Sequence, residues 1–416
     1  MPPSLDILHT VEFYSPSTGG SQEVVRQISE HLVRRGHSVT VATTRLPERD
    51  FSELEGVSIV EFDVHGNAVR GIDGRSSEYL DFVEAGGFDI MMNYSAQMWP
   101  TDLVLPGLKD LEMARVFVPC GFSSMHDPRY ADYYQRMREW LLDYNACVYL
   151  SNSYQDIEFA RSCGARNSVV IPNGASRAEF DRVPRVDIRQ RLGIPRDHFL
   201  LILVGSHTGQ KGHEEAIRIF SRARVENATL VIIANDFGRG CGTKCKVLDR
   251  VFDLDVRNRV SGKDLIITSL TREETLAAYH EADLFLFPSN IECSPIVLFE
   301  AMASRTPFLT TDVGNAAEIV EWSRGGVVMP TLRDDRGLAH ADVKGSSELL
   351  ERLLKDSGWR DDMSERGYRA WTERFTWEAI AERYEDLYLD VVSKRTEGER
   401  MLAGASGSRL DRASSR

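Results

Sequence analysis

The chain has 416 residues, of which 42% are hydrophobic and 27% charged, and its formal net charge is −13. This length predicts two domains, because single hydrophobic cores rarely grow beyond about 250–300 residues. The acidic balance argues against nucleic acid or an anionic bilayer as the main partner. The start, MPPSLDILHT, lacks the pattern of a signal peptide, and no run approaches the roughly 18 apolar residues of a membrane span. We therefore expect a cytoplasmic protein without a transmembrane segment, although peripheral contact with a membrane stays open.

The first part of the chain alternates between strand-like and helical segments. LDILHTVEF is typical of a strand and YSPSTGG of a loop, and SQEVVRQISEHLVRRG has its apolar residues on one helical face. The β-branched run HSVTVATT follows, and FDIMMNYS, ARVFVPC and NACVYLSNS continue the alternation. Strands that alternate with helices predict a parallel sheet covered on both faces.

The turn-forming residues Pro172, Asn173 and Gly174 interrupt this pattern, which then restarts with FLLILVG. Further strand-like runs are ATLVIIAN, DLIITSL, ADLFLFPS, TPFLTTDVG and GGVVMP. We therefore expect α/β domains at residues 1–174 and 175–375, each with a doubly wound parallel sheet, facing a cleft.

The C-terminal part is expected to be helical at SSELLERLLKD and again at TWEAIAERYEDLYLDVVSKR. The second of these predicts a C-terminal helix at residues 376–395. Residues 396–416 are polar, rich in small residues and without a period, so we expect a mobile tail.

The six cysteines are scattered, and several lie in apolar runs, as is usual in a reducing compartment. Cys241 and Cys245 form a C-x3-C pair, a spacing that can indicate zinc. No second pair of cysteines or histidines at ligand spacing follows them. We therefore interpret the pair as a coincidence and predict no metal site.

The stretch PSNIECSPIVLFEAMA follows a buried-strand pattern and contains a short apolar helix. We expect this helix to begin at Pro295, with Ser294 as its N-cap. The amides of Ile296 and Val297 would then point out of the positive end of the helix dipole. Such an end, at the carboxyl end of a parallel strand, favours binding of a phosphate.

Glu292 and Glu300 lie on either side of this helix start. Ionised carboxylates accept hydrogen bonds from vicinal hydroxyls, so the pair could hold sugars on both sides of a bound diphosphate. Most glutamates are solvated surface charges, and an eight-residue spacing arises by chance. The helix is apolar on nearly every side, however, so Glu300 is not expected on its solvent-exposed face, and a buried carboxylate needs a partner.

A second phosphate loop is predicted in FLLILVGSHTGQKGHEEAIRIF, which reads as strand, glycine-rich loop and helix. It is not a P-loop, because Gln210 and Gly212 stand where that motif requires Gly and Ser or Thr. A lone lysine is more often a surface residue. Beside Gly205 and a strand end, Lys211 is predicted to contact the diphosphate.

Together these motifs resemble glycosyltransferase family 4, whose members are retaining enzymes with two Rossmann-like domains in the GT-B arrangement. The resemblance extends over nearly the whole chain. It includes PSTGGSQEVVRQISEHLVRRGHSVTVAT, VVIPNGASRAEF, LVGSHTGQKGHEEAI, LFLFPSNIECSPIVLFEAMASRTPFLTTDVGNAAEIV and RFTWEAIAERYEDLYLDVV. The last of these corresponds to a helix that, in the family, crosses back to brace the first domain.

The resemblance implies roles for individual residues. Glu300 would accept hydrogen bonds from the ribose hydroxyls, Glu292 would orient the transferred sugar, and Lys211 would neutralise the leaving diphosphate. The other donor-binding positions would be Gly20, Gly205, Ser206, Thr268, Leu270, Ser294, Ile296 and Val297. The nucleobase would rest against backbone near Thr268 to Leu270.

Three positions depart from the family pattern. Ser206 replaces a common arginine, Pro295 replaces a common glycine, and Cys120 before Gly121 stands where an acceptor-side histidine is usual. His126, six residues further on, is a candidate substitute for that catalytic histidine.

The resemblance further implies front-face attack, in which the leaving phosphate oxygen takes the proton of the acceptor. It implies a nucleoside-diphosphate sugar as co-substrate, no metal requirement and no bound cofactor. The acceptor hydroxyl stays open, as do the nucleotide and the sugar. Alternatives are a catalytically impaired protein that binds nucleotide sugars, or a nucleotide-sugar epimerase of the same fold. A nicotinamide oxidoreductase is disfavoured, because no G-x-G-x-x-G opens either domain.

Overall fold

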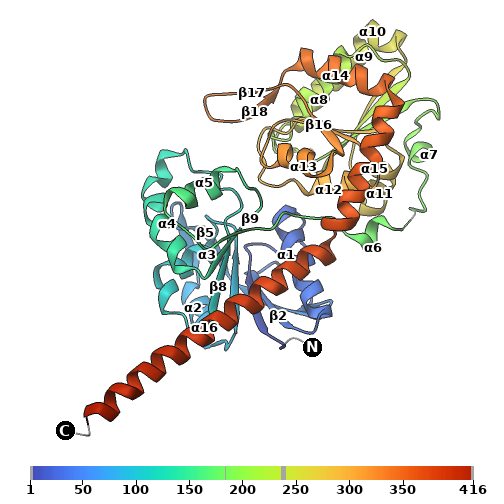
Figure 1. The fold of residues 1–416 in the computed structure, drawn as a ribbon. Helices are drawn as coiled ribbons and strands as arrows, with labels where there is room; N and C mark the ends of the chain where they lie inside the picture. The colour runs from blue at the N-terminus through green and yellow to red at the C-terminus, as the bar shows by residue number, and fades with distance from the viewer. Residues whose placement is uncertain (1–2, 183, 236–239, 414–416) are drawn as a thin grey trace. The chain divides into compact units, whose positions relative to one another are not determined.

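The computed structural model describes residues 3–182, 184–235 and 240–413, with side chains as far as Glu397. It divides into unit 1, residues 1–171 and 380–416, and unit 2, residues 172–379 (Figure 1). The chain therefore leaves unit 1 after residue 171, where we expected a boundary after 174, and returns to it after residue 379 rather than 375.

The described residues of unit 1 form an eight-stranded sheet in the order β10-β9-β8-β7-β1-β2-β4-β3. All neighbouring strands are parallel except β3 and β4. The strands are β1 (Asp6–Thr10), β2 (Ser38–Thr44), β3 (Glu53–Leu54), β4 (Val57–Phe62), β7 (Ile90–Tyr94), β8 (Ala114–Val118), β9 (Ala146–Tyr149) and β10 (Ser168–Val170). A separate hairpin is formed by β5 (Val64–Asn67) and β6 (Gly71–Gly74).

Helices cover both faces of this sheet, as the alternating sequence pattern predicts (Figure 1). They are α1 (Gly20–Arg34), α2 (Ser76–Ala85), α3 (Trp99–Val104), the 3-10 turns η1 (Leu105–Asp110) and η2 (Pro128–Tyr130), α4 (Ala131–Asp143) and α5 (Gln155–Ser162). Leu8, Met91 and Phe117, from three neighbouring strands, all belong to one buried cluster.

The C-terminal helix α16 (Trp377–Ala413) packs against unit 1, as the family resemblance implies. Its Tyr388 hydroxyl lies 3.0 Å from His9 Nε2 in the centre of the sheet, and its buried Glu385 binds Arg35 and His37. The helix continues to Ala413, so most of the segment expected to be a mobile tail is helical in its backbone. Side chains beyond Glu397 lie outside the described part of the chain.

The described residues of unit 2 form a six-stranded parallel sheet in the order β13-β12-β11-β14-β15-β16. The strands are β11 (Phe199–Val204), β12 (Ala228–Ile233), β13 (Lys263–Thr268), β14 (Leu284–Phe287), β15 (Phe308–Thr310) and β16 (Gly326–Val328). A small hairpin is formed by β17 (Thr331–Arg333) and β18 (Ala339–Ala341).

Alternate residues of β11 belong to two different buried clusters. Leu200 and Ile202 pack in one cluster, and Leu201 and Leu203 pack in the other. Successive side chains of a strand point to opposite faces, so both faces of this sheet are covered by apolar residues. This confirms the doubly wound α/β architecture predicted from the sequence.

The longest helix of unit 2 that the sequence pattern did not predict is α15 (Ser357–Arg374). Its sequence is interrupted by Gly358 and Gly367, which weaken the helical signal. A Cβ at Gly367 would lie 3.0 Å from Gly325 Cα, so this glycine allows close packing of the two backbones. The other helices are α6 (Arg177–Phe180), α7 (Ile188–Leu192), α8 (His213–Arg222), α9 (Gly242–Leu254), α10 (Val256–Val260), α11 (Arg272–Glu281), α12 (Ile296–Ala303), α13 (Ala316–Ser323) and α14 (Val343–Lys355).

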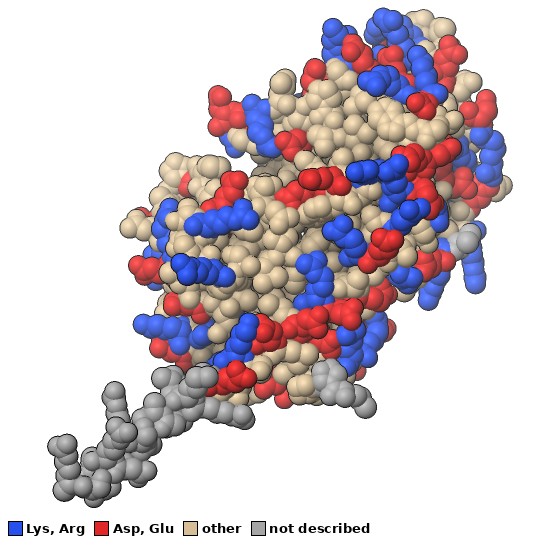
Figure 2. Space-filling view, viewed as in Figure 1, with Lys and Arg blue, Asp and Glu red and all other residues tan. Residues whose placement is uncertain are grey.

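Within the described ranges, no helix combines the length and apolar character that crossing a membrane requires. Acidic and basic side chains lie close together over the described surface seen in Figure 2.

Candidate active site

The candidate site lies where the strand order of unit 2 reverses. β12 and β13 lie on one side of β11, whereas β14, β15 and β16 lie on the other. In open parallel sheets, ligands bind outside the carboxyl ends of the strands at such a switch point. The segments that leave β11 and β14 there are residues 205–212 and 288–295, the two segments predicted to bind a diphosphate.

These two segments are bound directly to each other. The Asn290 amide donates to the Gln210 carbonyl at 2.9 Å, and the Ser289 hydroxyl oxygen lies 3.1 Å from the same carbonyl oxygen. Gly212 has a φ of +67°, and a Cβ there would lie 1.8 Å from the Pro288 carbonyl oxygen. Only glycine fits this contact, which fixes the backbone next to Lys211.

Lys211 and Glu292 meet across this pair of segments. Lys211 Nζ lies 2.7 Å from Glu292 Oε1, which also accepts a 2.8 Å hydrogen bond from the Ser289 hydroxyl. The aliphatic stem of Lys211 packs beside Gly205, where a Cβ would lie 3.3 Å from it. The site thus presents an ammonium, suited to an anion, beside a carboxylate, suited to hydroxyl groups.

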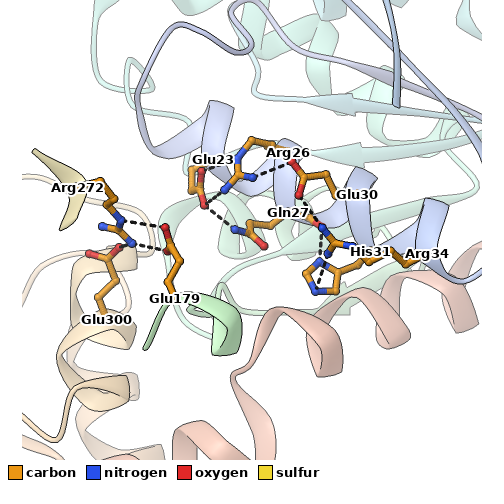
Figure 3. Close-up of polar contacts among 9 residues, drawn as sticks. All are labelled: Glu23, Arg26, Gln27, Glu30, His31, Arg34, Glu179, Arg272 and Glu300. Carbon is orange, nitrogen blue, oxygen red and sulfur yellow. Dashed lines mark hydrogen bonds and ion pairs between the residues drawn. The ribbon is translucent and has the colours of Figure 1, made fainter. Parts of the chain in front are cut away.

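Glu300 is buried on α12 but has a cationic partner. Arg272, the first residue of α11, lies 2.6 Å from Glu300 Oε1 and 2.7 Å from Glu179 Oε2 (Figure 3). The side chain of Glu300 is only 8% exposed. Burial opposes the charge of Arg272, yet the two carboxylates outweigh this effect and raise the pKa of the guanidinium. The ion pair compensates the buried charge, so burial of Glu300 does not by itself indicate a ligand.

The start of α12 differs by one residue from our prediction. Pro295 occupies the N-cap position and Ile296 begins the helix. Ser294 therefore does not cap it; its hydroxyl accepts a 3.1 Å hydrogen bond from the Asn315 side chain, and its carbonyl accepts one from Asn173. Proline at the N-cap provides no side-chain acceptor, so the amides of the first turn have no capping group.

The remaining donor-side positions of unit 2 lie at the same edge of the sheet. Val204 pairs with Ile233, which pairs with Thr268, so Gly205 and Leu270 follow strands that end together. Ser206 is exposed in the lysine loop. Two cavities of unit 2, of about 570 and 640 Å³, are not lined by Lys211 or Glu292; the larger is lined by Arg272, Glu179 and neighbouring residues.

Unit 1 holds four predicted positions. Gly20 is the first residue of α1, and a Cβ there would meet no described atom within 4 Å. Cys120 and Gly121 follow β8 with φ values of +60° and +91°. Burial raises the pKa of the Cys120 thiol to about 11, so at neutral pH the group stays a neutral thiol and is a poor nucleophile. His126 is exposed on a turn after this segment.

Three aromatic residues at or after the ends of β7 and β8 are part of the core. Tyr94, Trp99 and Phe122 are all buried. Trp99 donates a 2.7 Å hydrogen bond to Thr44, and Phe122 packs edge-on against Tyr134. These side chains stabilise unit 1 and offer no open ring face to a ligand.

The partners that hold the two glutamates were not predicted from the sequence. Ser289 belongs to the quoted Pro-Ser pair but received no role, and Arg272 follows Leu270 by only two residues. Two histidines, His207 and His213, were also not predicted; they lie with Cys241 and Cys245 in a group able to hold a metal ion.

Comparison with known proteins gives this site its family. Residues 184–370 match the family described as glycosyl transferases group 1. An uncharacterized glycosyltransferase of Methanocaldococcus jannaschii is 25% identical over 399 residues, covering 91% of this chain and 96% of that protein. D-inositol 3-phosphate glycosyltransferase of Xylanimonas cellulosilytica is 29% identical over 233 residues, which span 54% of this chain and 52% of that relative.

Two solved structures share the fold. Sucrose-phosphate synthase from Thermosynechococcus elongatus superposes with a TM-score of 0.74 at 20% identity, covering 93% of this chain and 99% of that one. Anabaena HepE in complex with UDP gives 0.71 at 14% identity, covering 92% and 99%. Residues 184–370 match the glycosyl transferases group 1, and the chain is a glycosyltransferase with the GT-B fold.

Proposed function

We propose that this glycosyltransferase moves a sugar from a nucleoside-diphosphate sugar to a hydroxyl acceptor with retention of anomeric configuration. The observation that carries the proposal is the 2.7 Å contact between Lys211 Nζ and Glu292 Oε1 at the switch point of unit 2. Two segments separated by 81 positions bring a cation and a carboxylate to the place where open parallel sheets bind ligands. The family match and a UDP complex among proteins of this fold support the same donor class.

Lys211 is proposed to neutralise the leaving diphosphate, together with the amides of Ile296 and Val297. Gly205 lets the lysine stem lie against the strand end, and Ser206 and Ser294 flank the phosphates. A diphosphate oxygen would then compete with Glu292 for the ammonium. Preorganised donors of this kind act where negative charge develops, and removal of one typically costs about 10²–10³-fold in kcat.

Glu292 is proposed to orient the transferred sugar by accepting its hydroxyl hydrogens, while Ser289 holds the carboxylate in place. The bond between the anomeric carbon and the phosphate oxygen breaks as the acceptor oxygen approaches the same face. The leaving phosphate oxygen takes the acceptor proton, so the chain needs no nucleophile of its own. In this mechanism the chain accelerates the reaction by positioning the donor and the acceptor and by neutralising the charge of the leaving diphosphate, and no metal is required.

The nucleoside half is assigned to Glu300 and to backbone between Thr268 and Leu270. A carboxylate has about four lone-pair sites, so Glu300 can bind Arg272 and still accept from ribose hydroxyls. Gly20 is assigned to the phosphates, and Cys120, Gly121 and His126 to the acceptor side. Thermal shifts with a panel of UDP-, GDP- and ADP-sugars would identify the base, because ligand at 100-fold its Kd adds about 2.7 kcal/mol of stability.

Three variants separate these roles. Glu292→Gln should lower kcat more than donor affinity, and Glu300→Gln should weaken binding of the nucleoside diphosphate itself. The exposed Glu226→Gln is the matched control. Adding or omitting Mg²⁺ should not change the rate, and NMR of the first-formed product should show the anomer of the donor.

Two outcomes would overturn the proposal. Donor binding without either transfer or slow hydrolysis would indicate a protein that only binds nucleotide sugars. Unchanged kinetics in both the Glu292 and the Glu300 variant would remove these assignments.

A further inference from the structure

Four potential metal ligands converge beside the lysine loop. His207 lies in the loop after β11, and His213 is the first residue of α8. Cys241 directly precedes α9, and Cys245 lies in its first turn. One ligand atom from each of these four residues lies within 4.8 Å of the others.

The two distances that join the histidines to Cys241 are close to those around a single tetrahedral ion. With metal–sulfur and metal–nitrogen bonds of about 2.3 and 2.0 Å, tetrahedral geometry places the ligand atoms about 3.3–3.8 Å apart. His207 Nδ1 and His213 Nδ1 lie 3.4 and 3.2 Å from Cys241 Sγ. The two imidazole rings approach edge to face, with centroids 4.7 Å apart. Both rings thus present the same nitrogen to the same thiol.

Three of the four residues are buried, and Cys241 is half-buried, although the loop around His207 is exposed. His207 is 2% exposed, whereas its neighbours Ser206 and Thr208 are exposed. His213 and Cys245 are each 1% exposed. Both histidines contact Cys241 Sγ here, and a metal ion binds imidazole and thiolate together.

The backbone also brings the cysteine segment unusually close to the histidine loop. Gly240 has a φ of +56°, and a Cβ there would lie 1.5 Å from the His207 carbonyl oxygen. No other residue fits without moving one of the two segments. Position 240 therefore allows Cys241 to reach His207.

The ligand set selects the metal. Thiolate and imidazole ligands favour zinc over magnesium or calcium, which prefer oxygen. Four protein ligands fill a tetrahedral shell, as in structural zinc sites, and leave no position for a substrate. The sequence analysis dismissed the C-x3-C pair because no second pair follows it; the histidines precede Cys241 by 34 and 28 positions.

We propose that His207, His213, Cys241 and Cys245 bind one structural zinc ion. The ion would join the loop between β11 and α8 to the start of α9. Zinc binding at these residues is independent of the reaction. Lys211 lies between the two histidines, so the ion would also hold the lysine loop in position for the diphosphate. This last consequence rests on the proposed function.

The direct test is the zinc content of the full chain, expressed with added zinc, freed of any affinity tag and measured by plasma mass spectrometry. We expect about one zinc per chain in the wild type and in Cys163→Ser, which changes a cysteine elsewhere in the fold. The double variant Cys241→Ser/Cys245→Ser should lose the zinc. Replacement by Co²⁺ should give the thiolate charge-transfer and tetrahedral d–d absorption of a Cys2His2 site in the wild type and in Cys163→Ser, but not in the double variant.

Several results would overturn the inference. One is a wild type that holds no zinc after supplementation and shows no Co²⁺ spectrum. A second is a disulfide between Cys241 and Cys245 instead of bound metal, detected by peptide mapping under non-reducing conditions. A third is equal zinc in the double variant and the wild type. These readouts need no donor sugar, so they stand whether or not the chain transfers a sugar, and the wild-type measurement decides even where the double variant fails to fold.

Discussion

Replacement of Arg272 by glutamine removes the positive charge that faces the buried carboxylate of Glu300. The two side chains approach to 2.6 Å, and Glu300 is 8% exposed whereas Arg272 is 44% exposed. Two unit charges about 4 Å apart attract by about 4 kcal/mol at an effective dielectric constant of about 20. Because water reaches Arg272, we take roughly half of this value and expect Arg272→Gln to lower the free energy of unfolding by about 2 kcal/mol.

Two further variants test this reasoning. Glu179→Gln removes the more exposed carboxylate and leaves the pair with Glu300 intact, so it should cost at most about 1 kcal/mol. The double variant Arg272→Gln/Glu300→Gln leaves no buried charge and should recover part of the loss of Arg272→Gln. Urea unfolding at neutral pH, combined in a double-mutant cycle, measures the coupling energy. The reasoning is refuted if Arg272→Gln costs no more than Glu179→Gln, or if the double variant shows no recovery.

Three other predictions follow from buried groups and a glycine. Burial raises the pKa of Asp102 to about 6. The native state therefore binds more protons than the unfolded chain between about pH 4 and 6, and its stability falls as the pH rises through this range. The free energy of unfolding of Asp102→Asn should therefore gain roughly 3 kcal/mol relative to that of the wild type between pH 4 and pH 8. Burial opposes ionisation of Glu385, but Arg35 and His37 outweigh this effect and lower its pKa. Glu385→Gln should therefore weaken the packing of α16 at pH values above the unfolded pKa of about 4.5, and the effect should shrink as the pH falls. Hydrogen exchange of the α16 amides measures this loss. Gly212→Ala should cost more than 2 kcal/mol by thermal unfolding, given φ +67° and the Pro288 contact, whereas Gly20→Ala should leave stability within about 0.5 kcal/mol.

Each of these has a result that contradicts it. A difference between Asp102→Asn and wild type that does not vary with pH would mean that the carboxyl is not perturbed in the fold. Equal protection of α16 in wild type and Glu385→Gln at pH 7 would show that this ion pair does not hold the helix. Wild-type stability of Gly212→Ala would show that the backbone beside Lys211 can move.

Local sequence signals predicted the architecture because they are set by neighbours along the chain. The apolar run FLLILVG and the one-sided helix after YSPSTGG specify a strand and a helix through side-chain periods of 2 and 3.6 residues. α15 escaped prediction because Gly358 and Gly367 weaken the same signals. Close packing of the backbone against Gly325 explains the glycine at position 367. Ser294 was assigned as a cap from propensity, yet its hydroxyl binds Asn315.

The sequence alone determined the α/β class, the two sheets, and the segments that meet at the switch point. Tertiary structure decided which side chains meet there: Lys211 beside Glu292, Arg272 beside Glu300, and His207 beside Cys241. It also buried Trp99 and Phe122 in the core, away from any ligand. The physical reason is that strand and helix patterns reflect local periodicity, whereas contacts between residues 28 to 81 positions apart depend on how strands are ordered and loops are packed.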